Sequence, residues 1–255
     1  MKFIVVALML PSLVACGQSA PVDQIDRTNI EVESPKEEKM KIEIWSDVVC
    51  PFCYIGKREF EKALNQFAEA KNVEIEWKSF QLMPDMPDNY GRTTYQYFAE
   101  KYGTSMEEAV SAHEQVTQRA KGLGLTYNFD VAIPANTGMA HQLIHFAKQH
   151  GKQDAAEEIL FKSYFTDGRN LNDLSTLLEI GATLGLDQDE LRKALENGTF
   201  ADAVNADIIE SQELGVRGVP FFVFDRKYAV SGAQDSSQFI AALEQAYAEW
   251  QLANQ

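Results

Sequence analysis

The stretch of sequence that decides the fold is MKIEIWSDVVCPFCYIGK, residues 40–57. Apolar and charged side chains alternate from Lys41 to Ile44, which is typical of a strand. Beyond the Cys-Pro-Phe-Cys sequence at 50–53, apolar residues recur at steps of three and four as far as Phe67, which indicates a helix. The paired cysteines therefore lie where a strand gives way to a helix.

The two cysteines of this stretch occupy unequal positions in the predicted helix. Cys50 lies at the helix N-terminus, where unpaired backbone N–H groups and the helix dipole favour a thiolate over a thiol. Pro51 suits the first helical position because its missing N–H costs little there. Cys53 lies one turn deeper and can close a disulfide with Cys50. We therefore predict a dithiol–disulfide exchange site with an accessible, reactive Cys50 and a less accessible Cys53.

Two other interpretations of the cysteine pair are open. The pair could supply half of a structural zinc site, but such a site needs about four ligands and the remaining cysteine is Cys16. His141 and His145 lie one helical turn apart, but no His-Glu-x-x-His pattern accompanies them, and surface or packing roles explain them better. A purely structural disulfide would close a very short loop and add little stability. We expect no metal, and no cofactor beyond the redox-active disulfide.

The composition is that of an ordinary globular protein with an acidic balance. The formal net charge is −15 at pH 7, which argues against nucleic acid as a partner. Such acidity is typical of a solvated surface and by itself implies no acidic substrate. The length suits one large domain or two modest ones.

The first part of the chain reads as a targeting segment and a tether. A basic start and a short apolar run predict a secretory signal peptide at 1–15, too short to span a bilayer as a helix. The sequence LVACG at 13–17 resembles the bacterial lipobox, which implies cleavage before Cys16 and durable anchoring through several acyl chains on that residue. The alternative is an ordinary signal peptide that leaves Cys16 as a reactive thiol. Residues 16–39 then form the lipidated N-terminus and a flexible tether.

This N-terminus also predicts where the protein acts. We expect a membrane-anchored lipoprotein that faces the periplasm or the cell exterior, where a dithiol meets an oxidising compartment. Gly17 follows Cys16 at a position where aspartate would often signal inner-membrane retention in Gram-negative bacteria. The outer membrane is therefore favoured if the source is Gram-negative.

The order of elements after the cysteine pair predicts the fold class. An alternating pattern at 73–78 indicates a second strand, and the pattern from Thr93 to about Asn205 is helical, with Thr104 and Glu107 expected to form a capping box. A hairpin at 220–231 and a final helix follow. This is the order of an α/β thioredoxin fold with an inserted all-helical domain. The predicted divisions are a first thioredoxin part at 40–90, a helical insertion at 91–205 and a second thioredoxin part at 206–255.

Four stretches in this order resemble the DsbA-like thioredoxin superfamily, and most closely its FrnE-like branch. They are SDVVCPFCYIGK at 46–57, Asn136-Thr137 with Ala140-His141, GVRGVPFFV at 215–223 and SGAQ at 231–234. The resemblance covers roughly residues 41–250. It implies that Cys50 is the nucleophile and that Cys53 is the resolving cysteine. It also implies that Pro220 is cis and lies against the active-site disulfide, and that Val219 offers backbone hydrogen bonds to a substrate chain.

Two departures from the family pattern bear on the mechanism. Many thioredoxin-fold proteins carry a buried acid six residues before the first cysteine, but Ile44 stands there. Asp47 or Glu43 could serve instead, and the sequence leaves this open. The family's strong oxidant has histidine between its cysteines, whereas Phe52 cannot donate a hydrogen bond or a charge. We therefore expect a less strongly stabilised thiolate, and the direction of exchange stays open. We also expect Phe52 to contact the substrate.

Three functions compete for this sequence. The leading one is a thiol:disulfide oxidoreductase that exchanges disulfides with cysteine-containing exported proteins and needs a redox partner to recycle its dithiol. The second is a glutathione-dependent isomerase or transferase of the same fold that acts on small aromatic molecules. Those enzymes have serine at the first position and need no second cysteine, so the presence of Cys50 and Cys53 counts against this function. The third is a non-catalytic lipoprotein that uses the fold as a binding surface.

Overall fold

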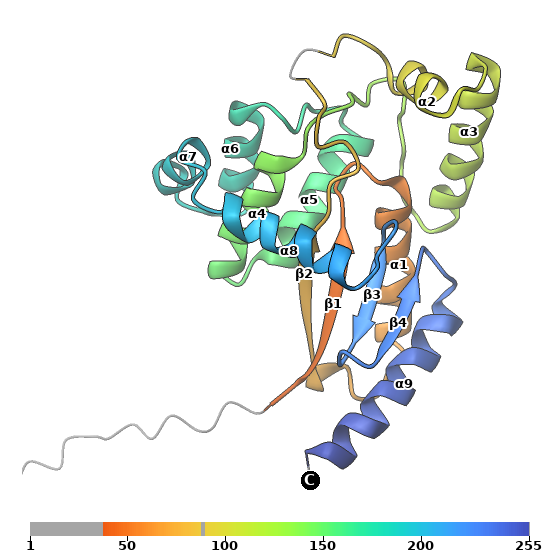
Figure 1. Ribbon diagram of the computed structural model, residues 1–255, viewed down its shortest axis with the longest axis vertical. Coiled ribbons are helices and arrows are strands. Elements are labelled where there is room, and N and C mark those ends of the chain that lie inside the picture. The colour runs from red at the N-terminus through yellow and green to blue at the C-terminus, as the bar shows by residue number, and fades with distance from the viewer. Residues whose placement is uncertain (1–37, 88–89, 255) are drawn as a thin grey trace, which may run out of the picture. The chain divides into compact units, whose positions relative to one another are not determined.

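The core of the protein is a mixed sheet whose central strands come from distant parts of the chain. The computed structural model describes residues 38–87 and 90–254. Within them the strand order is β2-β1-β3-β4, with β2 parallel to β1, and β3 antiparallel to both β1 and β4 (Figure 1). The strands are β1 (Met40–Ser46), β2 (Val73–Ser79), β3 (Phe221–Phe224) and β4 (Tyr228–Ser231). The predicted strand at 73–78 and the predicted hairpin are thus confirmed.

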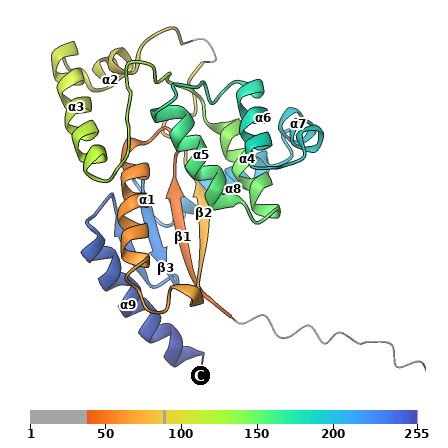
Figure 2. The same ribbon diagram turned by 180° about the vertical axis from the view of Figure 1, so that it is seen from behind.

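Helices cover both faces of this sheet. Ile44 of β1 pairs with Phe222 of β3, and the ring of Phe222 packs against Phe60 and Phe239. Those two aromatic residues belong to α1 (Pro51–Leu64) and α9 (Ser236–Ala253), which therefore share one face (Figure 2). On the other face the indole N–H of Trp45 donates to the carbonyl of Asp207, at 2.9 Å. Asp207 belongs to α8 (Ala201–Glu213), which lies across the sheet in Figure 1.

The remaining helices form the insertion between β2 and α8. They are α2 (Thr94–Tyr102), α3 (Met106–Gly122), α4 (Gly138–Gln149), α5 (Gln153–Phe165), α6 (Leu174–Thr183) and α7 (Gln188–Glu196), and a short 3-10 helix, η1 (Ala70–Asn72), precedes β2. The pair α2 and α3 lies beside the N-terminal end of α1, whereas α4 to α7 pack together on the far side of β2 (Figures 1 and 2). The predicted thioredoxin fold with a helical insertion is confirmed.

Two details of the predicted helical region are corrected. The capping box of α3 is formed by Ser105 and Glu108, one residue later than predicted, because the Ser105 hydroxyl accepts from the Glu108 N–H at 3.2 Å. The helical region also continues through α8 to Glu213, past the predicted limit at 205. The buried residues of α8 include Asp207, whose polarity breaks the apolar stripe that reveals most buried helices.

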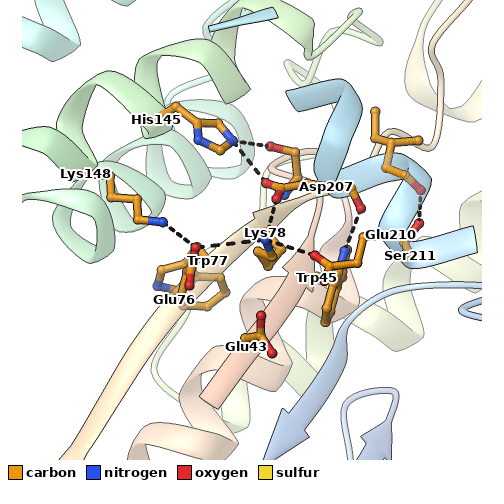
Figure 3. A network of polar contacts seen from close by, with 12 residues as sticks. Glu43, Trp45, Glu76, Trp77, Lys78, His145, Lys148, Asp207, Glu210 and Ser211 are labelled. Atoms are coloured by element: carbon orange, nitrogen blue, oxygen red, sulfur yellow. Dashed lines mark hydrogen bonds and ion pairs between the residues drawn. The ribbon is translucent and has the colours of Figure 1, made fainter. Parts of the chain in front are cut away.

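Asp207 joins α8 to the sheet through a buried network (Figure 3). Its side chain accepts from the Ser79 N–H at 2.9 Å, and its Oδ1 lies 2.7 Å from the Lys78 ammonium. The Nε2 atom of His145 on α4 lies 3.0 Å from Asp207 Oδ2. Burial favours the neutral acid, but the contacts with His145, Lys78 and Ser79 outweigh it and lower the pKa of Asp207 to about 2. The carboxylate is therefore a stabilising group as long as it is ionised.

We predict that Asp207→Asn lowers the free energy of unfolding by about 2 kcal/mol at pH 7, the equivalent of the lowered pKa. The folded-state pKa lies below the unfolded-state value of about 4. In the wild type, the contribution of the ionised Asp207 carboxylate to the free energy of unfolding is therefore present above about pH 4 and is lost as the pH falls towards 2. Urea unfolding at pH 7 and at pH 3 measures the effect. The matched control is Asp202→Asn, an exposed aspartate on the same helix, expected to cost less than about 0.5 kcal/mol. Equal losses in the two variants would contradict this role for Asp207.

Candidate active site

The two cysteines lie at the start of α1, as the sequence predicts. Cys50 is the residue that caps the helix and Pro51 occupies its first turn. A tight turn fixes this entry, because the Cys50 N–H donates to the carbonyl of Asp47 at 2.9 Å and the Cys53 N–H donates to the carbonyl of Cys50 at 3.0 Å. Both cysteines are free thiols in this structure. The arrangement places Cys50 at the positive end of the helix dipole and Cys53 one turn into the helix.

The loop before β3 closes over the first cysteine. The peptide bond between Val219 and Pro220 is cis, and the Cys50 thiol donates to the Val219 carbonyl with an Sγ–O distance of 3.5 Å. A Cβ atom on Gly56 would lie 2.8 Å from Pro220 Cγ, so the loop approaches α1 where glycine leaves room for it. Within the described ranges the Val219 N–H makes no hydrogen bond. The cis bond implied by the family resemblance is confirmed, and Pro220 lies against the helix that carries the cysteines.

The exposure of the two thiols differs less than the sequence suggests. Cys50 is 4 % exposed and Cys53 is 1 % exposed. The predicted accessibility of Cys50 is therefore corrected in degree, because residues of the Val219 loop and of the insertion lie around it. The two cysteines still differ in their surroundings, since Cys50 lines a cavity that opens to solvent and Cys53 does not line it.

Burial controls the protonation of the second cysteine. It raises the pKa of the Cys53 thiol well above its usual range, and the neighbouring Cys50 raises it further. Hydrogen bonds from the backbone of Asp47 and the side chain of Ser46 oppose this only in part. Cys53 is therefore a neutral thiol near pH 7 in the reduced protein, and it has to lose its proton before it can attack a disulfide.

Asp47 is a buried acid in the turn that leads into α1. Its carboxylate is fully buried, and Oδ2 accepts from the Leu82 N–H at 2.7 Å. Its Oδ1 lies 3.5 Å from His141 Nε2, and in the described part of the chain neither atom makes a hydrogen bond. Glu43, the other candidate, is paired with Arg226 of the turn between β3 and β4. Of the two acids that the sequence leaves open, Asp47 is the one in the turn before α1, where its backbone carbonyl accepts from the Cys50 N–H.

Sequence reasoning missed the contacts that two buried side chains near the cysteines make with acids. His141, assigned to packing or the surface, is buried beside Asp47. Lys57, one turn after Cys53, is buried and lies within ion-pair distance of Asp154 and Glu158, at 3.2 Å and 3.3 Å. These carboxylates outweigh the effect of burial and raise the pKa of Lys57. A lysine four residues after Cys53, on the same helical face, is the signal that could have indicated this pairing.

A cavity of about 620 Å³ lies directly beside Cys50. Phe52 and Val219, both predicted to contact the substrate, line it together with residues of α2 and α3. Two of the lining side chains are exposed to solvent: Phe52 is 40 % exposed and Tyr102 is 59 % exposed. Of the predicted site residues, Cys50, Phe52 and Val219 meet in this cavity, Pro220 lies just behind it, and Cys53 is covered.

The other predicted features concern metals and the membrane. Among the described residues no cluster of three or more histidine, cysteine, aspartate or glutamate side chains could hold a metal ion. No helix in the described ranges is both long and apolar enough to cross a membrane. Cys16, the signal peptide and nearly all of the tether lie outside the described residues.

Comparisons with known proteins agree with this geometry. The model of the DSBA-like thioredoxin domain matches residues 41–244. The chain is 39 % identical to a probable DsbA oxidoreductase from Streptomyces coelicolor, with a TM-score of 0.79 over 82 % of this chain and 91 % of that one. It is 30 % identical over 187 residues to an uncharacterised Bacillus subtilis protein, YwbO, covering 71 % of this chain and 85 % of the relative. A cytosolic disulfide reductase from Pseudomonas aeruginosa, DsbM, shares the fold at 16 % identity and a TM-score of 0.56, over 84 % of this chain and 100 % of that one.

Proposed function

The chain belongs to the DsbA-like thioredoxin family, whose members include oxidoreductases, and from this we propose that it exchanges disulfides with exported proteins through Cys50 and Cys53. The observation that carries the proposal is the unequal placement of two free thiols at one helix N-terminus. Cys50 faces a cavity and Cys53 is covered. An exchange site needs one sulfur that meets the substrate and one that completes the reaction internally.

The proposed reaction can be written with its atoms and electrons balanced. A substrate thiolate attacks Sγ of Cys50 in the Cys50–Cys53 disulfide, that S–S bond breaks, and Cys53 leaves as a thiolate that takes up a proton. A second substrate thiolate then attacks the substrate sulfur of the mixed disulfide and releases Cys50. The substrate dithiol loses two electrons and becomes a disulfide, while the enzyme pair gains them. A separate redox partner has to reoxidise the pair, and the reverse sequence reduces or repairs a substrate disulfide.

We propose that Asp47 gives the proton to the departing Cys53 thiolate and takes it from the Cys53 thiol in the reverse direction. Because burial raises the pKa of Cys53, the departing thiolate is reprotonated readily, and the attacking thiol has to be deprotonated in the reverse direction. The Asp47 carboxylate is fully buried and Oδ1 makes no hydrogen bond in the described ranges. The Nε2 atom of His141 lies 3.5 Å from that oxygen.

The N-terminus supports a membrane tether for this activity. We propose that the mature chain begins at an acylated Cys16 and holds the folded domain at a membrane that faces the periplasm or cell exterior. Cys16→Ser is expected to give an unprocessed or soluble protein. Mass spectrometry of the native N-terminus measures this, and a mature chain with an unmodified Cys16 thiol would contradict lipidation.

A second candidate function has one observation in its favour. The cavity beside Cys50 has the size of a small-molecule site, so an isomerase or transferase acting on an aromatic molecule with glutathione would fit its volume. Such an enzyme needs no second cysteine. Cys53→Ser would therefore leave its activity intact, whereas the same change would stop disulfide exchange.

The redox equilibrium of the cysteine pair with glutathione tests the proposed function. The proposal requires that Cys50 and Cys53 interconvert reversibly between dithiol and disulfide in one two-electron step. A non-catalytic binding protein with an unreactive pair would show no such transition.

A further inference from the structure

The cavity beside Cys50 has a charge opposite to that of the protein as a whole. The chain has 38 acidic and 23 basic residues and a net charge of −15. Yet the described residues that line the cavity include Lys101 and Arg217 and not a single aspartate or glutamate. His113 also lines it, but burial outweighs a hydrogen bond to the Ala109 carbonyl and lowers the pKa of His113. The cationic groups of the wall near pH 7 are therefore Lys101 and Arg217.

Neither of these cations forms an ion pair with a carboxylate of residues 38–87 or 90–254. Arg217 is exposed, and in the described part of the chain it forms no ion pair. The Lys101 ammonium lies 3.5 Å from the Leu82 carbonyl and 5.3 Å from the centre of the Tyr97 ring. Most other buried or half-buried basic groups near the cysteines, such as Lys57, are surrounded by acids. Two cations without an acidic partner among the described residues therefore mark a place that attracts an anion.

The rest of the cavity wall favours an apolar chain. Phe98, Phe129 and Tyr164 contribute to its interior, and the exposed rings of Phe52 and Tyr102 contribute to its rim. Exposed aromatic side chains gathered at a cavity are typical of a site that binds another protein segment. The Val219 N–H has no hydrogen-bond partner among the described residues and belongs to the same residue as the carbonyl that contacts Cys50, so it offers a main-chain hydrogen bond to an extended segment.

We propose that the cavity binds an extended substrate segment with an acidic side chain close to its reactive cysteine, and that Arg217 and Lys101 bind that carboxylate. The proposal rests on the proposed exchange function and adds the substrate class. Arg217 lies two residues before Val219, so the cation is close in the chain to the carbonyl that contacts Cys50 Sγ. Long-range repulsion from the net charge acts against acidic substrates. A preference for them therefore has to come from these two cations.

A competition between two peptide disulfides tests the substrate class. The protein is Cys53→Ser, in which Cys50 attacks a symmetric peptide disulfide, forms one mixed disulfide and releases one peptide thiol without further reaction. Both peptides are five residues long, have blocked termini and contain one cysteine, with either glutamate or glutamine two positions away from it. Acid quenching and mass spectrometry then give the ratio of the two mixed disulfides.

We expect the glutamate peptide to react about fivefold faster at low ionic strength, and the preference to fall towards unity at about 1 M salt. The double change Lys101→Glu and Arg217→Glu should reverse the preference. The control is Arg192→Glu with Lys193→Glu on α7, which alters the net charge by the same amount away from the cavity. Circular dichroism confirms that all variants are folded.

Each other outcome has a definite meaning. Equal reaction of the two peptides, or an equal effect of the control pair, overturns the role of Arg217 and Lys101 and leaves the exchange function standing. The competition is repeated with the same peptides carrying a free terminal carboxylate. A preference seen only with these unblocked peptides means that a small thiol compound occupies the cavity, and it overturns the proposal of a protein segment. Absence of any mixed disulfide at Cys50 instead contradicts the exchange function itself.

Discussion

Replacing Cys50 with serine is expected to reduce disulfide exchange to the background rate of the assay. The reason is that Cys50 is the thiol at the N-terminus of α1 that also lines the cavity. A serine hydroxyl cannot form the S–S bond through which both electrons pass. Oxidation of a reduced, unfolded protein by stoichiometric enzyme measures the loss.

The matched variant is Cys53→Ser, which should behave differently. It keeps the thiol that meets the substrate and loses the covered one, so it should accumulate mixed disulfides at Cys50 that resolve slowly. Mass spectrometry after acid quenching detects them. If Cys53→Ser formed no mixed disulfide while Cys50→Ser did, the roles assigned to the two cysteines would be reversed.

Replacing Asp47 with asparagine is expected to slow the attack of Cys53 on a mixed disulfide by about 10²-fold near pH 7, the lower end of general base effects. Burial raises the pKa of Cys53, so the thiol needs a base at this pH. Above the folded-state pKa of Cys53 the thiolate forms without that base. The deficit of the variant should therefore shrink as the pH rises. Asparagine retains an oxygen that can accept from the Leu82 N–H, which Asp47 Oδ2 accepts now.

The control for this prediction is Glu43→Gln. Glu43 is the other acid that the sequence allows, but it is buried and paired with Arg226. Its replacement should lower stability and leave the pH dependence of resolution unchanged. Stopped-flow measurement of resolution against pH distinguishes the two variants. A pH profile of Asp47→Asn that coincides with wild type would exclude Asp47 as the proton acceptor.

The local sequence pattern was sufficient to predict those parts of the site whose conformation depends on residues that are neighbours in the sequence. The strand, turn and helix around Cys50 follow from alternation, a proline at the first helical turn and apolar spacing. The hairpin of β3 and β4 follows from two apolar runs and a polar turn, in which Asp225 and Arg226 adopt the left-handed conformation. The cis form of Pro220 came from the family resemblance.

Other features depend on contacts between distant residues, which one sequence does not display. Asp207 looks like a surface acid on a polar helix, and only its contacts with Ser79 and His145 show that it is buried. The pairing of His141 with Asp47 joins α4 to the end of β1. The low exposure of Cys50 likewise results from a loop that is 169 residues away along the chain.

The redox equilibrium of Cys50 and Cys53 against glutathione tests the central claim most directly. The protein is equilibrated with defined ratios of reduced and oxidised glutathione, quenched with acid and alkylated, and the two cysteines are followed by peptide mass spectrometry. This readout separates them from Cys16. We expect both thiols to be lost together in one reversible transition that follows two-electron stoichiometry, in which a tenfold change in the equilibrium constant corresponds to about 30 mV. A pair that keeps one redox state across the whole range, or two cysteines that react independently, would contradict the account.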